Sequence, residues 1–397
     1  MNHHMTRKKN RLELNRYPPF IYILMILSMK LSWLTWLRWF AALTVVFYHL
    51  NQYRNTLGLS EFSWDFYQFT EHLVFVVSIF FVFSGFFRSL SYWKTWHTAI
   101  EVPRFFPSLR ERWLRIAPVY YLVLILTFIL VIFWEGFSWS WLLRLFSGFT
   151  FLSWVSPRTF FPVDINWPLW FIAYDMLWWI GVSIALMFVI KLKKIWHIVW
   201  SFVGIWILLF GLHFLWISLP WPKISWIAGE WFPIYNPFLF GLHFLMGAVL
   251  WGIMEWMKRK KFEKHFIFDI WAILSFFFLG YFLWQIRASW DWEYSWPHGP
   301  YHFPITMLGI AWLIVSLPYS RYIGNLFDNA LLSFIARISY SLYVFHVLII
   351  VMLQEYVFTD TLFSWSHWVY FSLSALILSL VVAYIMNRWI ENREWVK

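Results

Sequence analysis

The stretch WLRWFAALTVVFYHL, residues 36–50, has the apolar composition of a membrane-spanning helix, yet it contains Arg38 near its start and His49 near its end. A cation on the lipid-facing side of a helix costs at least ~2.5 kcal/mol. The two residues are 11 positions apart, so they lie on one helix face, ~16 Å apart along the axis. One inward stripe would hide both from lipid. The alternative is that Arg38 reaches the inner interface and His49 caps the outer end.

The composition of the whole chain is that of an integral membrane protein. Of 397 residues, 61% are hydrophobic and only 13% are charged, which is too little charge for the surface of a soluble protein. The 45 Phe and 34 Trp residues suit the headgroup level of a bilayer. Cysteine is absent, which excludes disulfides, thiolate nucleophiles and cysteine metal sites. We expect no metal ligand set.

Apolar segments predict an all-α integral membrane protein with a bundle of about ten transmembrane helices. Most of the segments are long enough to cross ~30 Å of hydrocarbon. An amphipathic piece at 139–153 carries Arg144 and predicts an interfacial or re-entrant helix. The predicted spans are 31–50, 69–90, 117–134, 167–190, 195–219, 235–257, 266–286, 304–320, 338–355 and 367–387.

The distribution of basic residues predicts that both termini are cytosolic. With the N-terminus inside, 25 of the 31 Lys and Arg residues lie in inner segments, 5 lie in outer loops and Arg38 lies within the first span. Attraction to the cytosolic leaflet then explains the net charge of +11, so we expect no nucleic-acid partner. Residues 1–30 are predicted to be a basic cytosolic tail or interfacial helix. A transmembrane domain follows at 31–387, and a cytosolic tail at 388–397.

Two motifs place polar side chains at the second and third spans. In FFVFSGFF, residues 80–87, Ser84 and its glycine neighbour make a notch that suits either a close helix or a ligand. In RERWLRIAP, residues 110–118, Arg112 and Arg115 are three positions apart and can face one site. Guanidinium groups match phosphate oxygens well. Ordinary anchoring at the inner interface is the alternative explanation for both arginines.

Two later spans contain ionisable side chains. In NWPLWFIAYDMLWW, residues 166–179, Asp175 lies about two turns into a span that enters from outside. In ARISYSLYVFHVL, residues 336–348, Tyr340 and His346 lie on one drifting helical stripe. An ionisable residue in the middle of a span is by default a candidate functional residue.

Together these motifs resemble the membrane acyltransferase-3 family, multi-pass proteins that acylate sugars, polysaccharides and lipids at the cell envelope. The resemblance implies that His49 is catalytic, that Arg38 assists it, and that Arg112 and Arg115 hold acyl-CoA phosphates. The motifs occur in the family's order between residues 37 and 346, as LRWFAALTVVFYHL, FFVFSGF, RERWLRIAP, PLWFIAYD and ISYSLYVFH.

The resemblance also implies that Asp175 is a third catalytic residue and that Ser84, Trp170, Tyr340 and His346 support the site. The family's Trp-x-x-x-x-Glu pattern falls on Trp170 and Asp175, where the carboxylate is one methylene shorter than usual. Ser84 belongs to the SGF motif, and Tyr340 and His346 belong to the late SYSLYxxH motif. As in a catalytic triad, Asp175 is expected to orient a histidine.

The expected function is transfer of an acyl group, most commonly acetyl in this family, from cytosolic acyl-CoA to a hydroxyl of an envelope carbohydrate or lipid. His49 would act as general base or be acylated itself, and both routes stay open. Arg38 would stabilise a developing oxyanion or the CoA sulfur. Acyl-CoA is a donor substrate, and no permanently bound cofactor is expected.

The expected location is the cell membrane, the inner membrane of a bacterium, where membrane lipids are partners. Whether the chain works alone or with a separate envelope protein stays open. The alternative function is a transporter or exporter of a small anionic or acylated substrate. Against it, the sequence has no inverted repeat and no pairs of Gly/Pro-broken helices.

Overall fold

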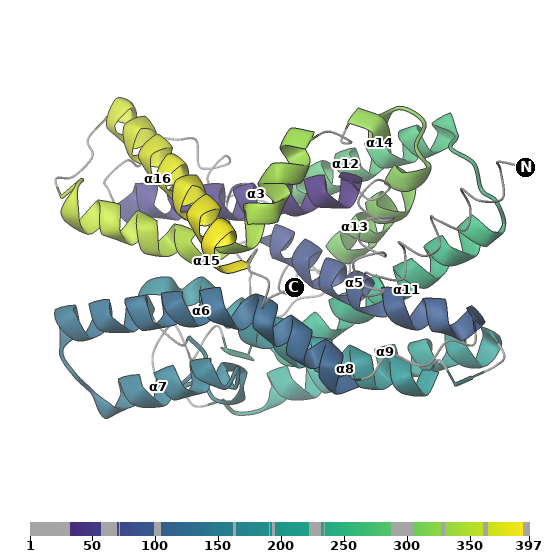
Figure 1. Ribbon diagram of the computed structural model, residues 1–397, viewed down its shortest axis with the longest axis horizontal. Helices are drawn as coiled ribbons and strands as arrows, with labels where there is room; N and C mark the ends of the chain where they lie inside the picture. Colours follow the sequence, from purple (N-terminus) through teal and green to yellow (C-terminus); the bar gives the residue numbers. More distant parts are fainter. Residues whose placement is uncertain are drawn as a thin grey trace, which may run out of the picture.

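The computed structural model describes most of the chain, and there all regular structure is helical, with no strand (Figure 1). The described residues are 32–56, 70, 72–98, 105–161, 164–189, 191–192, 195–221, 232–233, 235–286, 305–326, 330–359 and 364–391. The α-helices are α3 (Ser32–Thr56), α5 (Val77–Thr98), α6 (Phe105–Glu135), α7 (Trp139–Phe149), α8 (Trp170–Val189), α9 (Ile195–Ser218), α11 (Pro237–Arg259), α12 (Phe266–Ile286), α13 (Ile305–Ser316), α14 (Ile323–Leu326), α15 (Ala330–Tyr356) and α16 (Trp365–Met386). Short 3₁₀ turns are η1 (His72–Val76), η2 (Ser153–Val155), η3 (Asp164–Leu169) and η5 (Leu317–Tyr319), and a π-helical turn is η6 (Asn387–Glu391).

Each of the ten predicted apolar segments contains a helix, so the all-α prediction is confirmed for the described residues. Within them, six stretches are long and apolar enough to cross a membrane, and these include α6, α8, α9, α11, α15 and α16. Three apolar stretches in α5, α12 and α13 are shorter. The count of about ten spans and the cytosolic termini stay predictions.

The third helix begins earlier than its predicted span. Pro118 lies inside α6, which runs without a break from Phe105 to Glu135. Proline fixes φ near a helical value and removes one backbone donor, so a helix can continue through it at the loss of a hydrogen bond. The arginine motif and the span that follows it therefore form one helix.

The amphipathic piece beside this helix forms α7. The side chain of Ser138 accepts a hydrogen bond from the Ser140 backbone N–H, a cap that begins the helix. Trp141 is buried against the molecule, whereas Trp139 and Phe146 on the opposite face are exposed. The location of α7 in the membrane interface stays a prediction.

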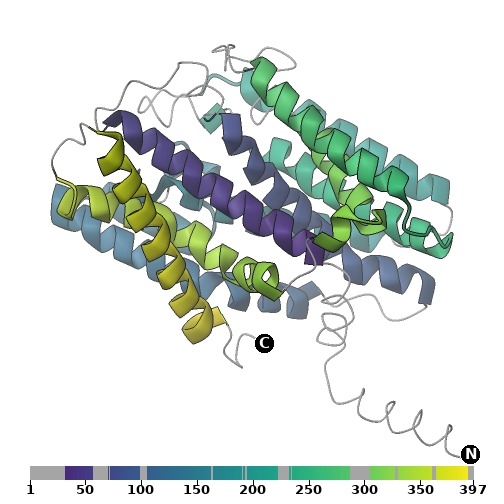
Figure 2. The same ribbon diagram turned by 90° about the horizontal axis from the view of Figure 1, so that it is seen from above.

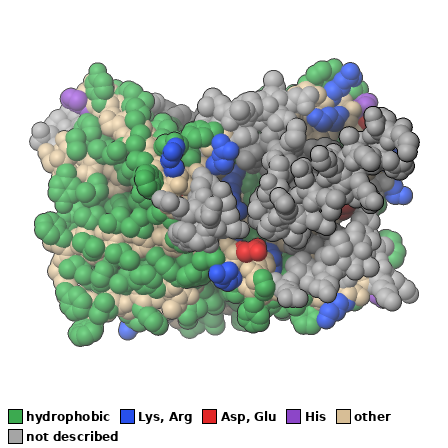
Figure 3. All heavy atoms as spheres, viewed as in Figure 1, with side chains coloured by type: hydrophobic (Ala, Val, Ile, Leu, Met, Phe, Trp, Pro, Cys, Tyr) green, Lys and Arg blue, Asp and Glu red, His purple; other side chains and the backbone are tan. Residues whose placement is uncertain are grey.

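Burial separates central helices from peripheral ones. In their most apolar windows, α15 is 83% and α11 is 72% buried, against 22% for both α9 and α16. Exposed side chains on the peripheral helices are mostly large and apolar, and Figure 3 shows them gathered over α6, α7 and α16. Apolar surface of this extent marks contact with lipid or a partner.

Among the described residues, the most extensive helix contact joins α5 and α11, and it uses two glycines. A Cβ on Gly85 would lie 1.9 Å from the Phe244 carbonyl oxygen, and one on Gly247 would lie 1.9 Å from the Val82 carbonyl oxygen. Only glycine lets two helix backbones approach this closely. The notch beside Ser84 therefore accommodates a helix. In Figure 2, α3 lies between α5 and α15 and contacts both.

Candidate active site

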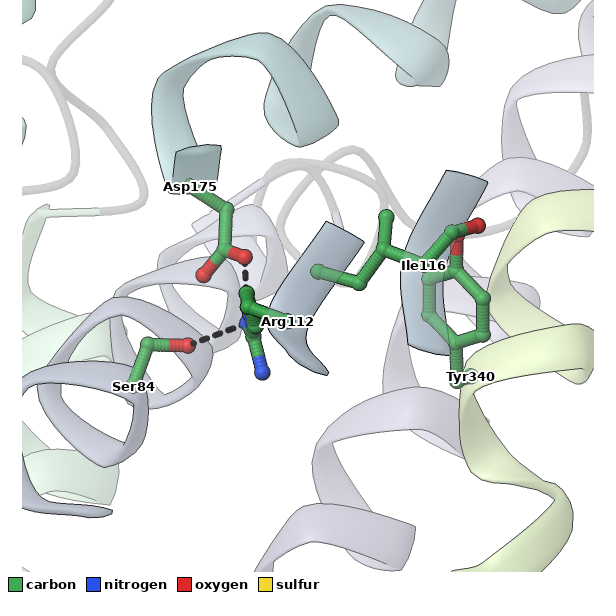
Figure 4. A network of polar contacts seen from close by, with 5 residues as sticks. All are labelled: Ser84, Arg112, Ile116, Asp175 and Tyr340. Carbon is green, nitrogen blue, oxygen red and sulfur yellow. Dashed lines mark hydrogen bonds and ion pairs between the residues drawn. The ribbon is translucent and has the colours of Figure 1, made fainter. Parts of the chain in front are cut away.

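Three helices meet at an ion pair. Arg112 on α6 pairs with Asp175 on α8 and donates a hydrogen bond of 3.3 Å to the Ser84 hydroxyl on α5 (Figure 4). The Asp175 side chain is 3% exposed and that of Arg112 is 17% exposed. A buried carboxylate needs such a partner, because an unpaired charge is costly away from water. The guanidinium of Arg112 also lies over the Trp179 ring, 4.4 Å from its centroid.

This ion pair does not use all of its polar atoms. Among the described residues, Nε of Arg112 and Oδ1 of Asp175 are buried and have no hydrogen-bond partner. Leaving such a group unpaired costs ~1–3 kcal/mol. The pair therefore retains one donor and one acceptor for a bound molecule or water.

Further charges lie near this ion pair. Arg38 on α3 interacts electrostatically with Arg112, Arg115 and Glu391, the last of which lies in η6. The same residues surround Arg115, whose side chain is exposed on α6. We call Arg38, Arg112, Arg115, Asp175 and Glu391 the charged cluster. It holds three guanidinium groups and two carboxylates, so its net charge is positive.

Glu391 was not predicted as a site residue. Its carboxylate accepts hydrogen bonds from the Ser341 hydroxyl and, at 2.8 Å, from the Asn387 amide. Asn387 also donates to the Arg337 carbonyl oxygen at 3.1 Å, which fixes η6 on α15. Residues 388–391, predicted to begin a tail, thus continue the packed structure. The signal available in the sequence was a carboxylate about one turn beyond the last apolar segment.

At the opposite end of α3, two histidines from different helices face each other. The ring centroids of His49 on α3 and His346 on α15 are 5.1 Å apart. Both side chains are buried, with exposed fractions of 3% and 0%. Trp167 in η3 packs edge-on against His49, with centroids 4.7 Å apart. The structure thus brings together two histidines whose motifs lie nearly 300 residues apart in the sequence.

Hydrogen bonds orient both imidazole rings. Nδ1 of His49 lies 2.9 Å from the Gln52 amide oxygen, and the Gln52 amide nitrogen donates to the Tyr48 hydroxyl at 2.6 Å. Nδ1 of His346 lies 2.6 Å from the Tyr343 carbonyl oxygen. Because carbonyl and amide oxygens only accept, each Nδ1 carries the proton. Nε2 of His346 is buried and has no partner among the described residues.

A cavity with room for about one water molecule adjoins His49. Residues of η3 line one side of this cavity. The Tyr343 hydroxyl of α15 holds η3 in place by donating to the Pro168 carbonyl oxygen at 2.9 Å. The Asn166 amide adds a bond of 3.1 Å to the Val344 carbonyl oxygen. The lining residues are Val45, Tyr48, His49, Val77, Trp167, Pro168, Trp170 and Tyr343.

Asp175 does not orient a histidine, so this expectation is corrected. Its one bonded oxygen contacts Arg112. The reason is its position: it interacts with Arg38, and His49 lies ~16 Å farther along α3. The amide of Gln52 takes the place next to His49 instead.

Two of the predicted supporting residues, Trp170 and Tyr340, make contacts between segments of the fold. Trp170 lines the cavity and packs edge-on against Tyr235, with centroids 4.7 Å apart. The Tyr340 hydroxyl donates to the Ile116 carbonyl oxygen at 2.8 Å and so joins α15 to α6 (Figure 4).

A buried arginine was not predicted as a site residue, because its position at the end of a predicted span is explained equally well by ordinary anchoring at the inner interface. Arg88 is 3% exposed and donates to the hydroxyls of Ser183, Ser108 and, at 2.9 Å, Tyr92. It lies 5.0 Å from the centroid of the Trp179 ring, which Arg112 also contacts. The Trp179 ring therefore makes cation–π contacts with the guanidinium groups of both Arg88 and Arg112.

Within the described ranges, no group of three or more His, Cys, Asp and Glu side chains is arranged to hold a metal ion. A family model described as an acyltransferase domain, that of the acyltransferase-3 family, matches residues 31–388 of the chain. No curated protein and no solved structure gives a significant match. The matched region includes every predicted site residue, from Arg38 to His346.

Proposed function

The chain belongs to the acyltransferase-3 family, and on that premise we propose that it moves an acyl group from cytosolic acyl-CoA to a hydroxyl of an envelope carbohydrate or lipid. The family and the apolar helices make it a multi-pass membrane acyltransferase. That the group is acetyl and that the membrane is a bacterial inner membrane are parts of the proposal. The observation that carries it is the pairing of a charged cluster and a histidine pair at opposite ends of α3.

The charged cluster supports binding of the donor's phosphates. Arg38, Arg112 and Arg115 supply three guanidinium groups, which suit phosphate oxygens better than ammonium groups do. The unpartnered Nε of Arg112 offers a further donor. Asp175 holds Arg112 in place before a ligand arrives, so less side-chain entropy is lost on binding.

The histidine end supports acyl transfer. Nε2 of His49, with the proton on Nδ1, takes the proton from the acceptor hydroxyl as its oxygen attacks the thioester carbonyl carbon. The carbon–sulfur bond then breaks, and the CoA thiolate leaves with the proton that His49 has held. Acyl ester and free CoA are the products, and His49 returns to its initial state.

The experiment uses the full chain in membranes, with labelled acetyl-CoA, and measures both free CoA and label in carbohydrate and lipid fractions. We expect His49→Ala to abolish transfer. We expect the double variant Arg112→Gln, Arg115→Gln to raise the KM for acetyl-CoA at least about tenfold, by loss of two charge-assisted contacts. Arg110→Gln is the matched control, because Arg110 is exposed on the same helix.

Full transfer by His49→Ala would refute its catalytic role. A KM for the double variant equal to that of Arg110→Gln would refute donor binding at the charged cluster. Export of an unmodified substrate without CoA release would favour a transporter and would overturn the proposed function as a whole.

A further inference from the structure

The group that orients His49 is a neutral amide on the same helix. Gln52 lies three residues beyond His49, so the two side chains meet on neighbouring turns of α3. The amide oxygen is 2.9 Å from Nδ1 of His49. The amide nitrogen is committed to the Tyr48 hydroxyl at 2.6 Å. Gln52 therefore has both of its polar ends bonded, with the amide oxygen toward His49.

Ring contacts keep His49 in place, but they do not decide which nitrogen carries the proton. Tyr48, Trp167 and His346 pack against the imidazole, with centroids 4.8, 4.7 and 5.1 Å away. In His346, Nδ1 is hydrogen-bonded to the Tyr343 carbonyl oxygen. Of the hydrogen bonds in the described region, the one to Gln52 is what distinguishes Nδ1 from Nε2 of His49.

We propose that Gln52 is a positioning residue that keeps the proton on Nδ1 of His49, so that Nε2 presents its lone pair to the acceptor hydroxyl. The inference rests on the proposed acyl transfer. With the amide oxygen facing Nδ1, as in the structure, the hydrogen bond from Nδ1–H favours this tautomer, because the alternative tautomer would place two acceptors against each other. A base in the wrong tautomer cannot accept the substrate proton.

An amide suits this position better than a carboxylate. Gln52 is half-buried beside His49, which is 3% exposed, so a carboxylate at this position would lose part of its hydration at a higher cost than an amide does. Gln52 accepts the same hydrogen bond without that cost. This is a physical reason why the histidine-orienting group is Gln52, while Asp175 lies where an arginine neutralises it.

Two substitutions test the role of Gln52. Gln52→Met keeps the length of the side chain and removes both hydrogen bonds. Gln52→Glu keeps an acceptor toward Nδ1 and removes the amide donor. Gln354→Met is the matched control, because Gln354 is a half-buried glutamine about two turns beyond His346 on α15.

The first measurement is independent of activity. In protein labelled with ¹⁵N-histidine, the signals of His49, assigned by their loss in His49→Ala, report which nitrogen is protonated. We expect the Nδ1–H tautomer in the parent, in Gln52→Glu and in Gln354→Met, and a mixture of tautomers in Gln52→Met. An unchanged tautomer in Gln52→Met would overturn the proposal, even if acyl transfer is confirmed.

The second measurement is acyl-transfer kinetics. We expect Gln52→Met to lower kcat about 10- to 100-fold, with the KM for acetyl-CoA unchanged, because only the base is affected. Gln52→Glu should recover most of kcat, which a merely structural role would not predict. Equal losses in both variants would overturn the acceptor role of Gln52. A correct tautomer pattern without acyl transfer in the parent would instead refute the proposed function.

Discussion

The glycine contact between α5 and α11 gives a prediction that does not depend on function. Gly85→Ala would place a Cβ 1.9 Å from the Phe244 carbonyl oxygen, whereas ordinary contact begins at 3.4 Å, so the helices must separate by about 1.5 Å. The obstacle is backbone, which no rotamer change can move. Overpacking a core costs ~1–3 kcal/mol even where side chains can adjust. We therefore expect Gly85→Ala, and likewise Gly247→Ala, to lower the free energy of unfolding by about 3 kcal/mol or more.

The assay is thermal unfolding of purified protein in detergent, followed by intrinsic fluorescence and by the yield of monodisperse protein. Gly204→Ala on α9 is the control, because a Cβ there meets nothing within 4 Å. By helix propensity alone, an alanine should be neutral or stabilising at all three positions. If Gly85→Ala and Gly247→Ala melt at the temperature of Gly204→Ala, the close approach of the two helices is wrong.

Two further predictions concern the charged cluster. Asp175→Leu should lower the free energy of unfolding by about 3–5 kcal/mol, because it leaves the Arg112 guanidinium without its ion-pair partner. The double variant with Arg112→Met should recover much of that loss. A double-mutant cycle of thermal unfolding measures the coupling between the two residues, and additive effects would contradict the ion pair. Glu391→Gln removes a negative charge near Arg38 and should lower the KM for acetyl-CoA several-fold at low salt. Steady-state kinetics measures this KM, with Glu355→Gln as the control because Glu355 is exposed. Equal KM values for the two variants would contradict binding of the donor phosphates at the charged cluster.

Much of the fold follows from the sequence. Apolar runs of about 20 residues must be helical in a membrane, because each backbone polar group needs a partner within its own segment. Helix boundaries were harder to predict, since caps and continuation through Pro118 depend on local hydrogen bonds. The Ser364 cap of α16 and the Asn236 cap of α11 illustrate this, as neither is part of an apolar pattern.

The candidate site was predictable only where one helix carries both partners. The 11-residue spacing relates Arg38 to His49 within α3, and helical periodicity suffices for that. The approach of His346 to His49 depends instead on how α15 packs against α3, which periodicity does not encode. The contact between Gln52 and His49 could have been predicted from the sequence, because residues three positions apart on a helix are neighbours.

The continuity of α3 has a consequence for substrate selection under the proposed function. An unbroken α-helix does not change its length, so it keeps Arg38 and His49 ~16 Å apart along its axis. The distance that the arm of the donor must span is therefore the same for every acyl group that it carries. A thioester with a truncated arm would therefore occupy the arginines with its carbonyl carbon out of reach of the base, and would act as an inhibitor instead of a donor.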